Sequence, residues 1–387
     1  MSSKSRWLVF LVSTPFVLLA IGGLLGASGA KQETYQHLRV FTDVVDRISE
    51  TYVEPADPDK VLDGAMRGLA DGLDSMSTFL TPEEVTLVSQ NAPLPPGETG
   101  LAIMRQYYLR IIGVREGSSA ARAGLRPGDL IRAIDGKPTR ETSALTGTRL
   151  LRGAVGSKVS LTVIRGNLAE PRTIELTREA GPTELVTSKR LPGGEGYVRV
   201  LSFGTGTAAA LRSAVQALAD AGAPGAIIDL RGTSEGSVSE GIAAARAFVK
   251  TGTLSILAGR GDVRTVTTAA AGDGAVTLKL VLLDSFGTAG AAEVFAAALN
   301  GNQRAEIVGA QTAGLAAVQR LVALPEGRGL WMTTQRYLAP DGKPIHEHGV
   351  EPQVLVEEPS VAFDETPPAG DAGLAKAIEQ LKAKKTA

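Results

Sequence analysis

The stretch from residue 281 to residue 319 constrains the fold more than any other part of the chain. It reads VLLDSFGTAGAAEVFAAALNGNQRAEIVGAQTAGLAAVQ: an apolar run, a turn of small residues at 287–290, and an alanine-rich segment at 291–299. This order is typical of a buried strand that leads directly into a helix. Backbone N–H groups at such a helix N-terminus suit the oxyanion holes of acyl-transfer enzymes. Yet the turn offers no obvious nucleophile.

The chain around this stretch alternates strands and helices from residue 183 onward. Apolar runs at 196–200 and 226–230 are separated by an amphipathic stretch at 207–221, which predicts a βαβ crossover. Further elements are predicted in order: a helix over about 238–249, strands near residues 254, 266 and 281, the helix from 291, and a strand at 307–309. We therefore expect helices packed on a mainly parallel or mixed sheet.

Composition excludes several classes of function. The net charge of −1 gives no electrostatic argument for binding nucleic acid. The chain has no cysteine, which rules out disulfides and thiolate sites, and three histidines give little support to a zinc cluster. We expect no cofactor.

The N-terminus predicts where the body of the protein lies. Lys4 and Arg6 precede an almost uncharged run over residues 7–30, long enough to span a bilayer at about 20 residues. A retained anchor would leave the N-terminus cytoplasmic and the body in the periplasm. Because Ser28-Gly29-Ala30 also resembles a cleavage site, a signal peptide at 1–30 and a soluble periplasmic or secreted body stay open.

A helical region is predicted over residues 31–91. Apolar residues between Leu38 and Ile48 are spaced to form one face of a helix. The segment LDSMSTFLTPEE at 73–84 suggests a capped turn before a further helix. Two compatible interpretations stay open: a helical region that packs beside the rest of the chain and mediates assembly, and a helical hairpin without a function of its own.

Residues 92–178 resemble a bacterial PDZ domain. The clearest signature is SSAARAGLRPGDLI at 118–131, where glycines and a proline suit a tight turn before a strand. The resemblance implies that protein C-terminal tails bind by adding a strand to the sheet edge, with their carboxylate on backbone amides. The residues implied in peptide binding are Gly100, Leu101, Ala102, Ile103 and, on a helix over 142–152, Leu145. The alternative is that the domain serves as a spacer.

The 281–319 stretch resembles the C-terminal processing peptidases, or tail-specific proteases. That family carries a turn close to G-S/T-A-S-A-S-E and, downstream, T-F-G-K-G-x-V-Q. The resemblance places Gly290 where the family has its nucleophilic serine and Leu315 where it has the lysine base, at the family spacing of 25 residues. A glycine cannot attack a peptide bond, and a leucine cannot accept a proton. Gln319 matches the glutamine that assists the lysine.

The oxyanion region implied by the resemblance is also altered. The family sequence D-L-R-x-N-x-G-G supplies a backbone donor, and here Asp229-Leu230-Arg231 is followed by a glutamate, Glu235, in place of the first glycine. Gly236 and Ala291 complete this region. A carboxylate beside a developing oxyanion would oppose it.

The resemblance covers nearly the whole chain after residue 35. It implies a multidomain α/β protein: an N-terminal helical region, an inserted β-rich PDZ domain, and a crotonase-like α/β peptidase core at 179–356. Residues 357–387 read as a linker and a C-terminal helix.

Two functions follow as hypotheses. The first is a membrane-tethered pseudopeptidase that binds tails as a scaffold or adaptor, as a homo-oligomer or paired with an active relative. The second is a working serine-type endopeptidase, either with a relocated nucleophile or with one supplied in trans. The side chains considered for that role are Ser234, Ser237, Ser285 and Thr288, with Lys343, His346, Glu347 and His348 as bases.

Overall fold

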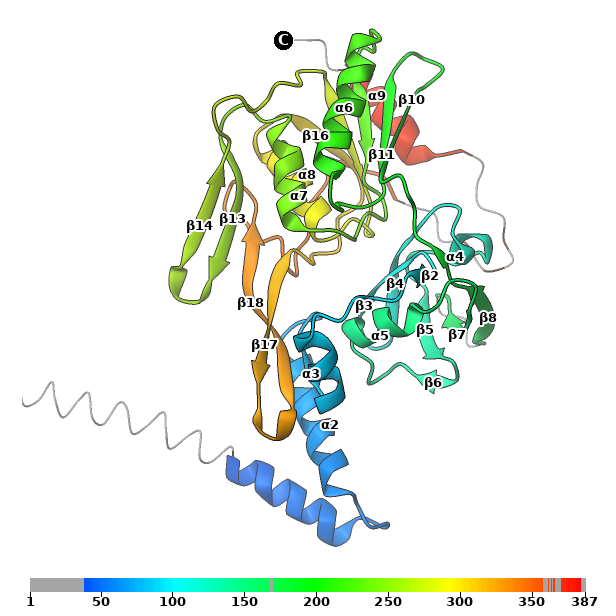
Figure 1. The fold of residues 1–387 in the computed structure, drawn as a ribbon, viewed down its shortest axis with the longest axis vertical. Helices are drawn as coiled ribbons and strands as arrows, with labels where there is room; N and C mark the ends of the chain where they lie inside the picture. The colour runs from blue at the N-terminus through cyan, green and yellow to red at the C-terminus, as the bar shows by residue number, and fades with distance from the viewer. Residues whose placement is uncertain are drawn as a thin grey trace, which may run out of the picture. The chain divides into compact units, whose positions relative to one another are not determined.

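The structure is a computed structural model that describes residues 38–166, 170–357 and 370–383, together with residues 361, 363 and 365. The chain divides into two compact units, the first ending at Leu69 and the second beginning at Ala70 (Figure 1). The expected anchor or signal peptide at residues 1–30 lies outside the described residues. Among the residues that are described, no helix has both the length and the apolar character that a membrane span needs.

The first unit is helical, as the sequence predicts. Residues 38–51 form one helix, and α2 (Pro58–Asp71) follows. The apolar residues of the first helix are largely exposed, including Leu38 and Val40.

A six-stranded sheet forms the centre of the second unit. Its strands run β10-β11-β12-β15-β16-β19, parallel from β11 onward and antiparallel only between β10 and β11. Their bounds are β10 (Val186–Arg190), β11 (Gly196–Val200), β12 (Ala226–Asp229), β15 (Leu280–Asp284), β16 (Ala305–Gly309) and β19 (Val354–Leu355). The predicted mainly parallel sheet is confirmed.

The two faces of this sheet are covered by different helices. Since successive side chains of a strand point to opposite faces, Ile228 packs into one hydrophobic cluster and its neighbour Ile227 into another. Three helices cover the first face: α6 (Thr207–Asp220), α7 (Val238–Arg246) and α8 (Ala291–Gly301). The C-terminal helix α9 (Ala372–Ala383) covers the second through Ala377 and Leu381 (Figure 1). The core of the fold thus includes α9.

Helix α8 is the most deeply buried helix described. All its residues from Ala291 to Leu299 are buried, which small alanine side chains permit because neighbouring elements can approach closely. The Phe295 ring lies 5.5 Å from that of Phe203 and 6.1 Å from that of Phe248. This packing fixes the N-terminus of α8, where the small-residue turn ends.

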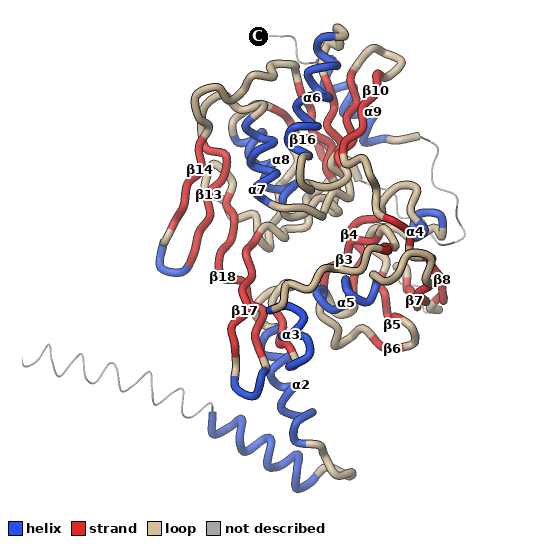
Figure 2. The backbone as a smooth tube through the Cα atoms, viewed as in Figure 1, coloured by secondary structure: helices blue, strands red, loops and turns tan. Residues whose placement is uncertain are grey.

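A second, antiparallel sheet lies in the same unit (Figure 2). Its order is β1-β18-β13-β14, with β17 paired to β18. The bounds are β1 (Thr78–Leu80), β13 (Thr253–Gly259), η1 (Arg260–Asp262), β14 (Arg264–Thr268), β17 (Ala317–Ala323), η2 (Pro325–Gly327) and β18 (Gly329–Leu338). After β1, α3 (Pro82–Ser89) begins with a capping box between Thr81 and Glu84, as the sequence indicates.

The PDZ-like region forms its own sheet and core. The strands run β3-β4-β5-β7-β8, with β6 paired to β5. Its elements are β3 (Leu101–Arg105), β4 (Leu109–Val114), α4 (Ser119–Arg122), β5 (Leu130–Ile134), β6 (Lys137–Pro138), α5 (Ala144–Leu151), β7 (Lys158–Ile164) and β8 (Arg172–Thr177). Its two ends are joined where β2 (Gly97–Glu98) pairs with β9 (Glu179–Ala180). Such joined ends are what an inserted domain requires.

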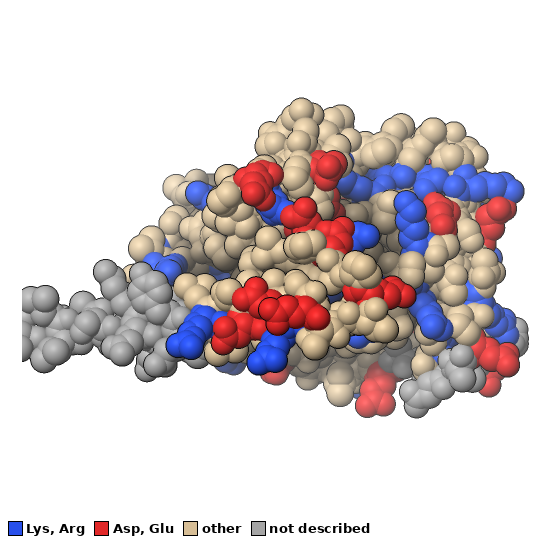
Figure 3. Space-filling model, turned by 90° about the horizontal axis from the view of Figure 1, so that it is seen from below, with Lys and Arg blue, Asp and Glu red and all other residues tan. Residues whose placement is uncertain are grey.

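The surface charge is mixed. Figure 3 shows acidic and basic side chains together on the face that it draws, as the net charge of −1 leads us to expect.

Asp284, at the end of β15, is an ionisable group in an unfavourable place. It is 1% exposed, and neither of its carboxyl oxygens has a hydrogen-bond partner among the residues that the structure describes. Burial raises the pKa of Asp284 well above 3.8, and the nearby carboxyl groups of Asp229 and Glu293 raise it further. The folded chain therefore favours the protonated form of Asp284.

This raised pKa predicts the pH dependence of stability. A raised pKa in the folded state gives stability that is present below the unfolded pKa and is lost as the pH rises through the folded pKa. We expect Asp284→Asn to raise the thermal midpoint by roughly 2–4 °C at pH 8 and to change it little at pH 4. Thermal unfolding followed by circular dichroism at both pH values checks this. A difference independent of pH would contradict it.

Asp371 supplies a control of opposite sign. Burial acts to raise its pKa, but hydrogen bonds from Arg231 and from the backbone of Leu374 outweigh burial and lower it. Its stabilising contribution is present above the unfolded pKa and lost as the pH falls through the folded pKa. Asp371→Asn should therefore destabilise the chain at pH 8 and have little effect in acid.

Candidate functional site

The turn before α8 has the geometry of a nucleophile elbow. Gly290 has φ 60° and ψ −112°, a conformation that L-residues adopt only under strain. A Cβ built at Gly290 meets no atom within 4 Å, so a side chain there would project into open space. The turn that would present a nucleophile is thus preserved, with a glycine at its tip.

Glu293 holds this turn in place. It is 0% exposed, and its Oε2 accepts hydrogen bonds from the N–H groups of Gly290 and Leu315, both at 2.8 Å. Its Oε1 accepts from the Thr312 hydroxyl at 2.5 Å and from the Gly314 N–H at 2.6 Å. Burial raises the pKa of Glu293, while these four donors act in the opposite direction. One carboxyl group therefore connects the position of the nucleophile to that of the base.

Gly290 and Leu315 line the same cavity, whose volume is ≈ 560 Å³. The structure thus brings together the two positions that the resemblance assigns to a catalytic dyad. Among the described residues that line it, the ionisable side chains are Arg152 and Glu235. The cavity therefore offers no histidine or lysine to accept a proton.

The loop after β12 forms another wall of this cavity. Glu235, Gly236 and Ala291 all line it, as the predicted oxyanion region requires. At Gly236, φ is 119° and an added Cβ would lie 2.3 Å from the carbonyl oxygen of Phe203, so only glycine fits. The backbone conformation at Gly236 therefore requires glycine, although the preceding residue is Glu235.

Glu235 has a partner that the sequence did not reveal. The Arg152 guanidinium, just after α5, lies 2.9 Å from the Glu235 carboxylate and 3.1 Å from that of Glu98. Glu98 also pairs with Arg115 at 2.6 Å. Because Arg152 is shared between two carboxylates, it compensates only part of the charge of Glu235.

The predicted peptide-binding residues lie along the edge of the PDZ-like sheet. Leu101, Ala102 and Ile103 form the start of β3, and Gly100 precedes them with φ 78°. A second cavity of ≈ 220 Å³ is lined by Gly100, Leu101 and Ala102. Leu145 lies on α5, but it lines neither cavity.

The residues of α5 that do line the cavities are Thr148 and Leu151. They lie three and six positions after Leu145. The sequence predicted the helix correctly, but it did not show which side of the helix faces β3.

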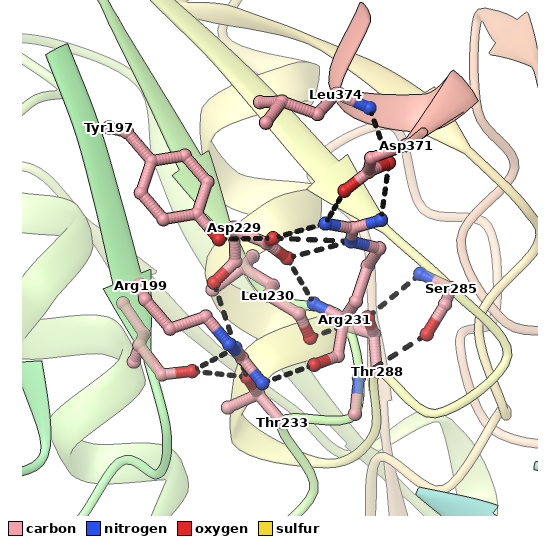
Figure 4. A network of polar contacts seen from close by, with 12 residues as sticks. Tyr197, Arg199, Asp229, Leu230, Arg231, Thr233, Ser285, Thr288, Asp371 and Leu374 are labelled. Atoms are coloured by element: carbon pink, nitrogen blue, oxygen red, sulfur yellow. Dashed lines mark hydrogen bonds and ion pairs between the residues drawn. The ribbon is translucent and has the colours of Figure 1, made fainter. Parts of the chain in front are cut away.

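A polar network fixes the carboxyl ends of β11, β12 and β15 (Figure 4). Asp229 accepts hydrogen bonds from Tyr197 at 2.8 Å and from the Arg231 guanidinium at 2.7 Å. Arg231 also binds Asp371, whose carboxylate accepts the N–H of Leu374 in α9. The loop after β12 is thereby connected to α9, the helix that covers the second face of the sheet.

This network explains the roles of two candidate nucleophiles. The Thr288 hydroxyl donates to the Leu230 carbonyl at 2.9 Å, and the Ser285 hydroxyl accepts from the N–H of Gly287 at 3.1 Å and of Gly232 at 3.3 Å. Thr288 is 0% exposed and Ser285 is 6% exposed. Both hydroxyls support the turn, and neither lines the cavity beside Gly290. Ser234 does line it.

The candidate bases lie elsewhere. His346 is 5% exposed, with its Nε2 3.7 Å from the Asp74 carboxylate. The Nδ1 of His348 lies 2.9 Å from the carbonyl oxygen of His346. Lys343 is an exposed side chain, 3.5 Å from Asp341. None of His346, His348, Glu347 and Lys343 is among the described residues that line the cavity with Gly290.

Gln319 contacts Thr333 and Met76. Its side-chain amide donates to the Thr333 hydroxyl at 3.2 Å and lies 3.3 Å from the Met76 sulfur. Met76 itself lines the cavity. The sequence did not identify Met76 as a residue of the cavity, because Met76 lies more than 200 positions before the elbow. The pairing of β1 with β18 brings its segment close to Gln319. Within the part of the chain that the structure describes, no group of acidic or histidine side chains is placed to hold a metal ion.

Comparisons with known proteins agree with this architecture. A model of peptidase family S41 matches residues 194–356, and a PDZ domain model matches residues 110–165. A carboxy-terminal-processing protease of Bartonella bacilliformis is 29% identical over 336 residues, covering 85% of this chain and 77% of the relative. The chloroplastic C-terminal processing peptidase of Tetradesmus obliquus is 30% identical over 332 residues, covering 80% and 72%. The solved photosystem II D1 C-terminal processing protease superposes with a TM-score of 0.67 at 27% identity, covering 84% of this chain and 94% of that one.

The connection made by Glu293 predicts a stability effect. Glu293→Gln keeps the shape of the side chain, but it replaces one acceptor oxygen with an NH2 donor that, in either orientation of the amide, faces at least one N–H group. We expect a loss of about 1–3 kcal/mol in the free energy of unfolding, measured by urea denaturation. Glu351→Gln, at an exposed position, is the matched control. Equal midpoints for the two variants would show that the buried carboxyl group is dispensable.

Proposed function

Because the chain belongs to peptidase family S41, we propose that it is a pseudopeptidase, which binds protein C-terminal tails through its PDZ domain without cleaving them. The observation that carries this proposal is the pair Gly290 and Leu315, at the two positions where a nucleophile and a base would meet in one cavity. Serine-type hydrolysis needs an activated hydroxyl and a group to take its proton. Neither side chain can supply either role.

The surrounding frame supports binding. The elbow turn, the buried carboxyl group of Glu293 and the loop after β12 are all in place around the cavity. The PDZ domain offers an edge strand, β3, and a helix, α5, beside it. These are the parts that a β-addition mode of recognition uses. A tail captured there would be held rather than processed.

One observation favours an active serine endopeptidase as the second candidate. Ser234 lines the same cavity as Gly290 and Leu315, and its side chain carries a hydroxyl group. The ionisable neighbours described there are Glu235 and Arg152, and Glu235 is already paired with Arg152. A relocated nucleophile at Ser234 would therefore need Glu235 to leave its partner and act as the base.

The location and the partners of the chain are part of the same proposal. The apolar run at residues 7–30, preceded by Lys4 and Arg6, supports a tether in the inner membrane with the body in the periplasm. A tethered tail-binding protein suits the role of a scaffold or adaptor. It would work as a homo-oligomer or beside an active relative that cleaves what it presents.

A restoration series tests whether the dyad positions are the reason for inactivity. We expect the unaltered chain and the double variant Gly290→Ser/Leu315→Lys to leave an unstructured protein with an apolar C-terminal tail intact. The double variant fails because Glu235 still opposes the oxyanion, and Arg152 compensates only part of its charge. Adding Glu235→Gly should give measurable cleavage, followed by mass spectrometry of the products.

The controls separate the two candidate functions. Ser234→Ala in the unaltered chain should change nothing if the chain is a pseudopeptidase. Cleavage by the unaltered chain that Ser234→Ala abolishes would instead establish a relocated nucleophile. Cleavage by the double variant without Glu235→Gly would show that Glu235 does not prevent catalysis.

A further inference from the structure

The two cavities described above are adjacent. Six residues line both of them: Leu101, Ala102, Thr148, Arg152, Ser234 and Glu235. The smaller cavity begins at Gly100, and the larger one ends at Gly290 and Leu315. Together the two cavities extend from Gly100, beside β3, to the elbow, and we refer to them as the groove.

The elbow end of this groove is apolar. Besides Leu315, side chains of Met76, Leu94, Ile103, Ile112 and Val238 line it. Gly290 adds no side chain, and a Cβ built there would have no atom within 4 Å, so the space beside it is open. The substitution of the dyad positions has thus left a pocket with a hydrophobic wall where a family member would carry a hydroxyl and an amine.

The opposite end of the groove carries charged side chains of both signs. Arg115 and Arg152 lie beside Glu98, and all three residues line the smaller cavity with Gly100. Among the strands that the structure describes, β3 pairs with β4 alone, so its other edge is free to pair with a further strand. Because the arginines here are already paired with Glu98 and Glu235, a terminal carboxylate at this end would rely on backbone N–H groups, as PDZ recognition does.

We propose that the pocket beside Leu315 takes an aliphatic side chain of the same extended protein tail whose carboxylate lies near Gly100. This rests on the proposed function, and it adds a second contact to the PDZ contact. The main chain of the tail adds a strand to β3, and one side chain upstream of the carboxylate enters the pocket. Leu315 is then a specificity-determining residue, which selects an apolar side chain in the tail.

The chemistry of the pocket sets the preference. An aliphatic side chain leaves water for a hydrophobic wall, which favours binding. An acidic side chain in the same place would lose its water without gaining a cation, because Arg152 is already paired with Glu98 and Glu235. Lysine at position 315 would reverse this preference for aliphatic over acidic side chains, because its ammonium group would supply a cation to the acidic side chain.

A charge exchange between the protein and a synthetic tail tests the proposal. The probes are fluorescein-labelled peptides of twelve residues ending in alanine with a free carboxylate, in which one upstream position at a time is leucine or glutamate within a serine and glycine background. Fluorescence anisotropy with the full chain in a mild detergent measures their affinity. At one upstream position, the unaltered chain should prefer leucine to glutamate by about tenfold or more. Leu315→Lys should reverse that preference at that position.

A matched control separates the pocket from general charge. Leu355→Lys adds the same charge at a leucine that is 66% exposed in β19 and outside both cavities, so the preference for leucine should persist. An unchanged order of affinities in Leu315→Lys would overturn the proposed pocket. The C-terminal amide of each peptide tests the PDZ contact separately, because loss of the free carboxylate should weaken binding to all three proteins. If the amides bind as tightly as the free acids, or no peptide binds, the proposed function fails as well.

Discussion

The hydrogen bonds of one buried carboxyl group, that of Glu293, hold the centre of this structure together. A fully buried carboxyl group is costly unless its oxygens are satisfied, and here four donors converge on it from the elbow turn and from residues 312–315. The two segments that carry Gly290 and Leu315 are therefore fixed relative to each other by a buried group that does not line the cavity. Under the proposed function, this separation would allow the frame of a peptidase site to persist without its reacting groups.

The arrangement around the site distributes functions among different residues. Ser285 and Thr288 use their hydroxyls to support the turn, and the network of Asp229 and Arg231 fixes the loop after β12 (Figure 4). Arg152 connects this loop to the PDZ domain through Glu235. The polar groups near the elbow thus serve structure, whereas the surface that faces the cavity is largely apolar. A site of this composition is suited to holding an extended chain.

Much of the fold could be predicted from local patterns. The apolar run before Asp284 and the alanine-rich segment after Gly290 gave the strand and the helix directly, because burial dictates both compositions. The partners that come from distant segments could not be predicted. Arg152 pairs with Glu235 from 83 positions away, and Met76 reaches Gln319 through the pairing of β1 with β18. Nothing in a local pattern encodes such partners, and for the same reason the packing of α9 on the core sheet was not foreseen.

The most direct test of this account measures binding and cleavage in one sample. The full chain is mixed with an unstructured protein that carries an apolar C-terminal tail, and native mass spectrometry follows both the complex and the mass of the tail-bearing protein over many hours. We predict a saturable complex that requires the free terminal carboxylate, with the mass of the tail-bearing protein unchanged. A shortened product that accumulates with time would contradict it, because it would mean that a chain with glycine and leucine at the dyad positions still hydrolyses peptide bonds.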